Sequence, residues 1–143
     1  IDFAETKSAL RTNIATRQKA EKRLAAGEAV VIFPSGGVAT APNVFGKAEE
    51  LPWKRFTAKL IQKSQAAVLP VYVEGQNSFL FQLASRLSLS LRLGLLLHEA
   101  RNKMGTRISI QIGDPIPFEN LVHLKNRQAL LEHLQESVES LAP

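Results

Sequence analysis

A loop of small residues follows a short apolar run, and its composition suits the binding of an anion. The run EAVVIFP (residues 28–34) is rich in β-branched side chains and ends at Pro34, after which come Ser35, Gly36 and Gly37. Glycine lets backbone N–H groups approach a ligand without a Cβ in between. Consecutive N–H groups can then hold a phosphate, a carboxylate or an oxyanion. Since ligands bind beyond the carboxyl ends of strands in open α/β sheets, we expect this loop to shape a binding site.

Several other chemistries are excluded by the same residues. The loop is not a P-loop, because the Gly-Lys-Ser/Thr ending is absent, and it is not a nucleophile elbow, because Gly-x-Ser-x-Gly is absent. An ordinary strand-to-loop turn is the alternative explanation of the two glycines. No metal site is predicted, because the chain has no cysteine and its three histidines have no partner at ligand spacing.

Three further polar residues are candidates for the same site. Gln76 and Asn77 follow the apolar run AAVLPVYVEG (residues 66–75), where a polar head group could bind them. The alternative, of equal weight, is that Asn77 caps a helix. Lys54 would add positive charge near the loop, although a single lysine is more often a solvated surface residue.

The spacing of apolar side chains predicts the helices and strands that position these residues. Helices are predicted over residues 5–27, 53–65 and 127–141, the first stopping at Gly27. The runs 28–34 and 66–75 are apolar throughout, as in strands buried on both faces, and Pro70 indicates an edge or a bulge. Residues 107–113 alternate, with Ile108, Ile110 and Ile112 on one side. The order strand, helix, strand predicts one α/β domain over residues 1–143, a mostly parallel sheet flanked by helices.

The segment from Phe79 to Leu97 is dominated by leucine and phenylalanine but contains Arg86 and Arg92. Two arginines at the centre of a membrane span would be costly, and the length is marginal. One or two amphipathic helices packed on the sheet are expected, with a basic surface lying in the membrane interface as the alternative.

The net charge of +5 favours anionic partners, which include nucleic acid, anionic lipid and phosphorylated substrates. Nucleic acid is disfavoured, because the basic residues are spread along the chain and only 6% of residues are aromatic.

Several blocks, in this order, resemble the lysophospholipid (glycerolipid) acyltransferase superfamily. IFPSGG lies where those enzymes carry Phe-Pro-Glu-Gly-Thr-Arg after a buried strand, and VLPVYVEG lies where they carry an apolar-Pro-Val strand. With FGKA, WKRF, LRLGLLLHE and IGDPIPFE, the chain is most similar to the bacterial hemolysin-like branch, which includes ornithine-lipid-type acyltransferases. The similarity covers residues 28–117.

This resemblance implies the transfer of a fatty acyl group from an acyl thioester to the hydroxyl of a lyso-lipid acceptor. The donor would be acyl-CoA or acyl carrier protein, and no cofactor would be bound. The protein would be peripheral, at the cytoplasmic face of the inner membrane. Ser35 stands in place of the family's Glu, and Gly37 and Val38 stand in place of Thr-Arg. Because that Glu and Arg help to hold the acceptor's phosphate, the departures favour a lyso-aminolipid over a glycerol-phosphate acceptor.

The family's His-x-x-x-x-Asp motif, whose histidine acts as the general base, has no counterpart here. The residues five positions after His98, His123 and His133 are Lys, Gln and Val. The motif lies N-terminal to the Phe-Pro-x-Gly block in the family, and the chain starts at Ile1, without Met. We therefore expect the C-terminal part of an acyltransferase domain, inactive by itself, with the catalytic residues upstream of Ile1. Missing strands would leave an exposed sheet edge and favour a homo-oligomer.

A second function class remains open. A basic α/β domain without the catalytic pair could be a non-catalytic module that binds lipid or phosphate at a membrane surface. Vesicle binding would not separate the two classes, because both would bind, whereas acyl transfer by a product that contains the missing motif would.

Overall fold

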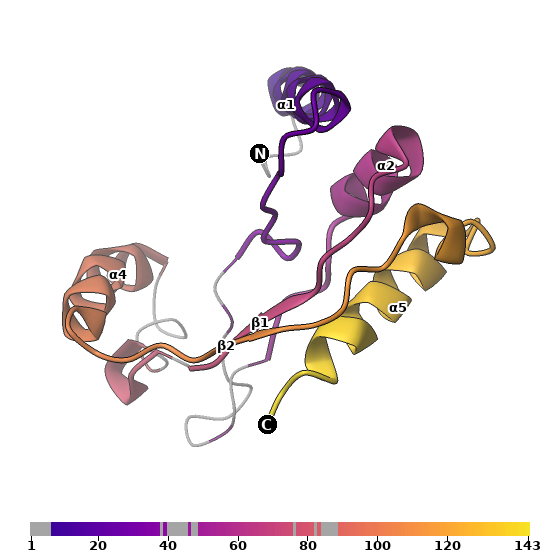
Figure 1. Cartoon of the computed structure of the whole chain (residues 1–143). Coiled ribbons are helices and arrows are strands. Elements are labelled where there is room, and N and C mark those ends of the chain that lie inside the picture. Colours follow the sequence, from indigo (N-terminus) through magenta and orange to yellow (C-terminus); the bar gives the residue numbers. More distant parts are fainter. Residues whose placement is uncertain are drawn as a thin grey trace.

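The computed structural model of the chain describes residues 7–37, 39, 46, 49–75, 77–81, 83 and 89–143. Its helices are α1 (Lys7–Ala25), α2 (Arg55–Ser64), α4 (Leu89–Lys103) and α5 (Arg127–Glu139), with a short 3₁₀ helix η1 (Phe118–Asn120). Its strands are β1 (Val71–Val73) and β2 (Ile110–Ile112). As Figure 1 shows, α1, α2 and α5 gather at one end of the strands, and α4 lies at the other.

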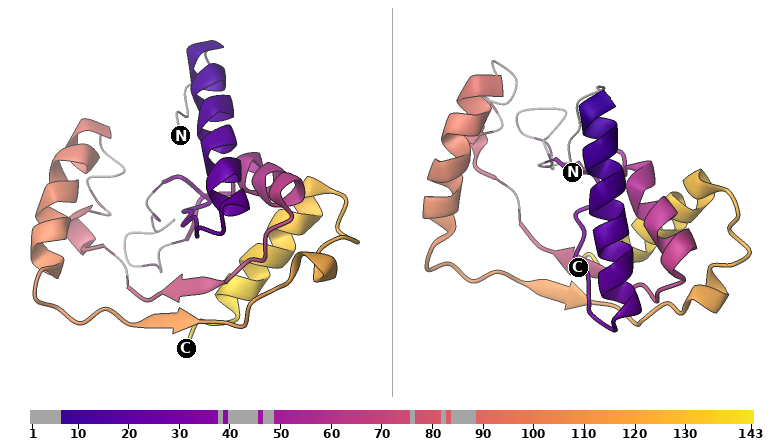
Figure 2. Two further views of the ribbon diagram at one scale, coloured as in Figure 1. Left: turned by 45° about the horizontal axis from the view of Figure 1, so that its top comes forward. Right: turned by 90° about the horizontal axis from the view of Figure 1, so that it is seen from above.

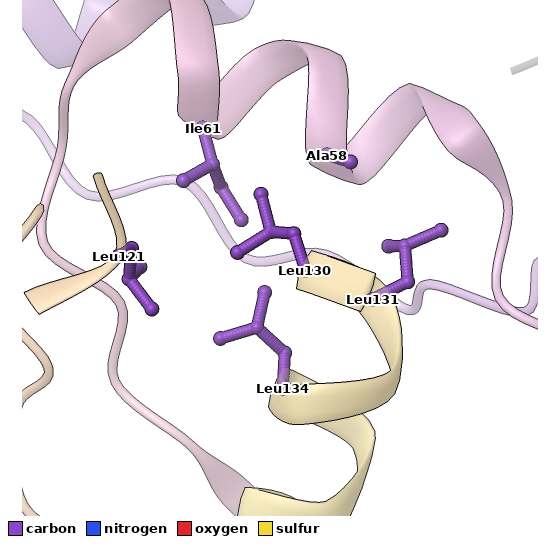
Figure 3. Packing of buried hydrophobic residues seen from close by; sticks show 6 residues of the cluster. All are labelled: Ala58, Ile61, Leu121, Leu130, Leu131 and Leu134. Carbon is purple, nitrogen blue, oxygen red and sulfur yellow. The ribbon is translucent and has the colours of Figure 1, made fainter. Parts of the chain in front are cut away.

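The buried core lies between α2 and α5. Leu130, Leu131 and Leu134 of α5 point toward Ala58 and Ile61 of α2 (Figure 3). Leu121, next to η1, closes the same cluster. The helix predicted over residues 127–141 is confirmed as α5, and its Leu131 and Leu134 are each 2% exposed. This packing fixes the angle between the two helices and carries most of the apolar burial in the described residues.

Helix α1 ends as predicted and is attached to α2. Gly27 adopts a φ of +78°, which favours glycine, and its N–H donates to the carbonyl of Leu24 at 3.0 Å. The carboxylate of Glu21 lies 3.2 Å from Nε of Arg17 and 3.1 Å from Nζ of Lys63. Because Lys63 belongs to α2, this ion-pair group joins the two helices.

The sheet is a two-stranded antiparallel ribbon. Val71 pairs with Ile112, Tyr72 with Gln111, and Val73 with Ile110. The prediction of a mostly parallel sheet is therefore wrong for the described residues. The chain runs out along β1, passes through the Leu-rich helices and returns along β2, so no parallel crossover joins these strands (Figure 1).

An irregularity interrupts the ribbon at Pro70, where an edge or a bulge was predicted. Beyond the ladder, Val68 pairs with Ile116. Three steps lead from Val68 to Val71, whereas four lead from Ile112 to Ile116, so the second strand carries one extra residue. The N–H of Gly113 donates to the carbonyl of Pro70 at 3.0 Å, inside this bulge.

The predicted burial of the strands is wrong. Residues 28–34 form no strand, and Val31 and Phe33 are 83% and 77% exposed. Val71, Val73 and the three isoleucines of residues 107–113 are also exposed. An apolar run becomes a buried strand only when other elements pair with it and cover it, and the described residues supply neither for residues 28–34.

The Leu-rich segment contains helical residues at 79–81 and 83, and then α4. Phe81 is fully buried, whereas Leu97 is 80% exposed. Figure 2 shows α4 standing apart from α1, α2 and α5 in both views. Packing of α4 against these three helices is therefore not observed. Among the described residues, no helix is long and apolar enough to cross a membrane.

Candidate functional site

The predicted binding loop forms a tight turn. The N–H of Gly36 donates to the carbonyl of Phe33 at 3.1 Å, which closes a four-residue turn from Phe33 to Gly36. Gly36 has a φ of +66°, a left-handed conformation that costs little only for glycine. Since the Gly36 N–H is used inside the turn, it cannot bind a ligand. Among the described residues, the N–H of Gly37 has no acceptor, which makes it the donor that this turn can offer to an anion.

Ser35 stabilises the turn from inside. Its side chain is buried, with 3% of the residue exposed. Its hydroxyl donates to the carbonyl of Gly37 at 3.3 Å. Ser35 therefore shapes the loop through its own backbone, and a larger or charged residue at this position would have to displace its neighbours.

The turn is attached to the start of α2 by a main-chain hydrogen bond. The N–H of Lys54, the N-cap of α2, donates to the carbonyl of Pro34 at 2.9 Å. A Cβ added to Gly37 would lie 2.6 Å from Cδ1 of Leu51, so only glycine fits without a shift of that leucine. The structure thus brings together the four predicted loop residues and Lys54, at the helix end where the dipole favours negative charge.

The other two predicted residues lie beyond β1. Gln76 is outside the described residues. Asn77 is half-buried, and no hydrogen bond joins it to the loop within the part of the chain that is described. The suggested capping role of Asn77 is wrong, because the hydroxyl of Ser78 accepts from the N–H of Phe81 at 3.3 Å. Val38 is also outside the described residues.

A buried acid that no motif of the sequence pointed to lies beside this segment. Glu99 of α4 is 3% exposed and accepts two hydrogen bonds from Ser78, one from the hydroxyl and one, of 2.8 Å, from the N–H. Burial would raise the pKa of Glu99, but the hydrogen bonds from Ser78 and the charges of His98 and Lys103 outweigh it and lower that pKa. The cap could have been predicted from the sequence, because a serine such as Ser78 is a common N-cap residue. Its contact with Glu99 could not, because the two residues are far apart in the chain.

The histidines do not form a catalytic pair in the structure. His98, His123 and His133 are all exposed. In the described ranges no group of three or more His, Cys, Asp or Glu residues is arranged to hold a metal ion. Among the described residues, the arrangement around the turn offers a backbone donor, the start of α2 and the cation Lys54, which suits binding of an anionic or polar group.

Comparison with known proteins identified one relevant family. A family model described as "Acyltransferase" matches residues 5–139, which is nearly the whole chain. A search of curated proteins and a search of solved structures each found no match.

Proposed function

Since this chain belongs to an acyltransferase family, we propose that the protein transfers a fatty acyl group from an acyl thioester to the hydroxyl of a lyso-lipid acceptor. The observation that carries the proposal is the family match over residues 5–139, together with the turn from Phe33 to Gly36 at the start of α2. The donor is acyl-CoA or acyl carrier protein. The reaction takes place at the cytoplasmic face of the inner membrane, where the protein is peripheral.

The acceptor is a lyso-aminolipid of the ornithine-lipid type, as in the hemolysin-like branch. The sequence has Ser35 and Val38 where the family has a phosphate-binding Glu and Arg. The burial of Ser35 supports this choice, because its hydroxyl is committed to the carbonyl of Gly37. The N–H of Gly37 and the positive charge of Lys54 at the start of α2 bind the polar head group.

The chemical step needs a base that takes the acceptor's hydroxyl proton, because a neutral hydroxyl is a weak nucleophile. The alkoxide then attacks the thioester carbonyl, a C–O bond forms, the C–S bond breaks, and the thiolate leaves and is protonated. No histidine among these 143 residues is followed five positions later by Asp. We therefore propose that the chain alone does not turn over and that a His-x-x-x-x-Asp pair outside these residues supplies the base.

The test is an acyl-transfer assay with two proteins: residues 1–143, and the product of the complete reading frame. Each is given acyl-CoA or acyl carrier protein together with lyso-ornithine lipid or lysophosphatidic acid. We expect transfer to lyso-ornithine lipid by the complete product only. If the complete product contains the His-x-x-x-x-Asp motif and transfers to neither acceptor, a non-catalytic lipid- or phosphate-binding module replaces the enzyme.

The acceptor assignment has its own variant. Val38→Arg restores the family's cation at this position. In the protein made from the complete reading frame, it should shift the choice of acceptor from lyso-ornithine lipid toward lysophosphatidic acid. Val31→Arg is the matched control, because Val31 is 83% exposed and lies outside the turn. Equal acceptor choice in the two variants would refute the role assigned to this loop.

A further inference from the structure

A second basic site lies between α2 and the start of α5. An open cavity of about 340 Å³ is present there, and no residue of the turn from Phe33 to Gly36 lines it. All of its lining side chains are polar or basic: Arg55, Gln62, Lys125, Asn126, Arg127 and Gln128. The volume is at the low end of ligand pockets, which suits a small polar group.

The walls of this cavity are held in place by hydrogen bonds between the two helices. Nε2 of Gln62 donates to the carbonyl of Lys125 at 3.2 Å, and Nε of Arg127 donates to Oε1 of Gln62 at 3.3 Å. The side chain of Asn126 caps α5 by accepting from the N–H of Gln128 at 2.8 Å. The buried leucines of α5 pack against Ala58 and Ile61 of α2 (Figure 3), so the two helices that contribute Gln62 and Arg127 to the cavity are packed together. The cavity is therefore formed before any ligand arrives.

Its charge is uncompensated. Three of the lining residues are cations, Arg55, Lys125 and Arg127, and none is an acid. Where the structure describes both partners, none of the three is ion-paired with a carboxylate. The N-terminal end of α5 adds the positive end of its dipole. Like charges gathered on one cavity repel one another, and a bound anion would relieve that repulsion.

We propose that this cavity binds a phosphate group. Two guanidinium groups and an ammonium group match the geometry and charge of phosphate oxygens. The amide of Gln62 is held by Lys125 and Arg127, and the amide of Gln128 donates to Glu132 at 3.0 Å, so the three cationic side chains are the groups that bind the phosphate. The phosphate belongs either to a soluble phosphorylated compound or to a phospholipid head group. The inference does not depend on the acyl-transfer reaction, and its tests need no turnover.

The first experiment is an NMR titration of the ¹⁵N-labelled chain with inorganic phosphate at low salt. We expect the amides of residues 125–128 to shift, with Lys125→Gln and Arg127→Gln each weakening binding about tenfold. Lys125→Gln is the cleaner variant, because the carbonyl of Lys125, rather than its side chain, holds Gln62. Lys59→Gln is the matched control, because Lys59 is exposed on α2 but does not line the cavity.

The second experiment distinguishes the two sources of phosphate. Vesicles of phosphatidylglycerol and of phosphatidylcholine are pelleted with the chain and with the same three variants. A soluble phosphate ligand is supported if the chain binds the free ion saturably. Lys125→Gln should then weaken this binding, and Lys59→Gln should leave it unchanged. Binding only to the anionic vesicles, with the same ranking of variants, supports a head group. The proposal is overturned if neither binds, or if Lys59→Gln weakens binding as much as Lys125→Gln.

Discussion

The paired hydrogen bonds between Ser78 and Glu99 should stabilise the contact between α4 and the helical residues 79–81. In Glu99→Gln the amide oxygen keeps the N–H of Ser78, which can only donate, so the NH₂ group faces the Ser78 hydroxyl and the bond from that hydroxyl to a carboxylate oxygen is lost. That costs about 1.5 kcal/mol of unfolding free energy, the lower end for a hydrogen bond to a charged group. Ser78→Ala removes the hydroxyl bond to Glu99 and also the cap on Phe81. We expect a loss of about 2.5 kcal/mol for this change, of which about 1 is the cap.

The two substitutions should not be additive. The bond between the hydroxyl of Ser78 and the carboxylate of Glu99 is lost in either single variant, so the double variant cannot lose it twice. We expect the loss of unfolding free energy in the double variant to be smaller than the sum of the two single losses by about 1.5 kcal/mol.

The same contact should make stability depend on pH in a defined direction. The folded pKa of Glu99 lies below its ordinary value of 4.5. Above the ordinary value the carboxylate is ionised in both states and its contribution is fully present. As the pH falls below it, the unfolded chain takes up the proton first, and the contribution is lost as the pH passes through the folded pKa. Glu99→Gln should remove this part of the acid sensitivity.

The assay is urea unfolding followed by circular dichroism, at about pH 7 and about pH 4, where this linkage acts. The four proteins of the cycle are compared with Glu136→Gln, a control with the same chemical change at an exposed position of α5. If the two losses are additive, or if Glu99→Gln keeps the acid sensitivity of the parent chain, the contact does not act as described.

Three further predictions concern the turn, the core and the sheet edges. Gly36→Ala should cost about 1–2 kcal/mol, because a Cβ is strained at a φ of +66°, and thermal unfolding of this variant measures it. Leu134→Ala should cost about 2–5 kcal/mol, because the residue is 2% exposed in the core, whereas Leu97→Ala, at an 80% exposed site, should be close to neutral in the same urea assay. The exposed apolar strands should drive self-association, so light scattering on a sizing column should show a dimer or larger species that Ile110→Lys reduces. A monomer at every concentration would count against that last expectation.

The helices could be read from the sequence because their signals are local. Apolar spacing located α1, α2 and α5 to within a few residues, and Gly27 marked the end of α1. The turn could also be predicted from the sequence, because the two adjacent glycines that follow Pro34 and Ser35 indicate a backbone without side-chain obstruction.

The strands were less predictable, because pairing and burial depend on distant residues. The run 28–34 has the composition of a buried strand but forms none among the described residues. The direction of β1 relative to β2 is set by the path of the chain between them, which periodicity does not encode. The contact of Ser78 with Glu99, 21 positions apart, could not be read locally for the same reason.

The bond that attaches the turn to α2 joins two main-chain atoms, the carbonyl of Pro34 and the N–H of Lys54. Every residue except proline supplies that N–H, so the side chain at position 54 can change without releasing the turn. The shape of the loop therefore does not depend on the side chain at position 54, which sets part of the charge beside the loop. Single substitutions at position 54 can therefore change the charge beside the turn, while the loop keeps its shape.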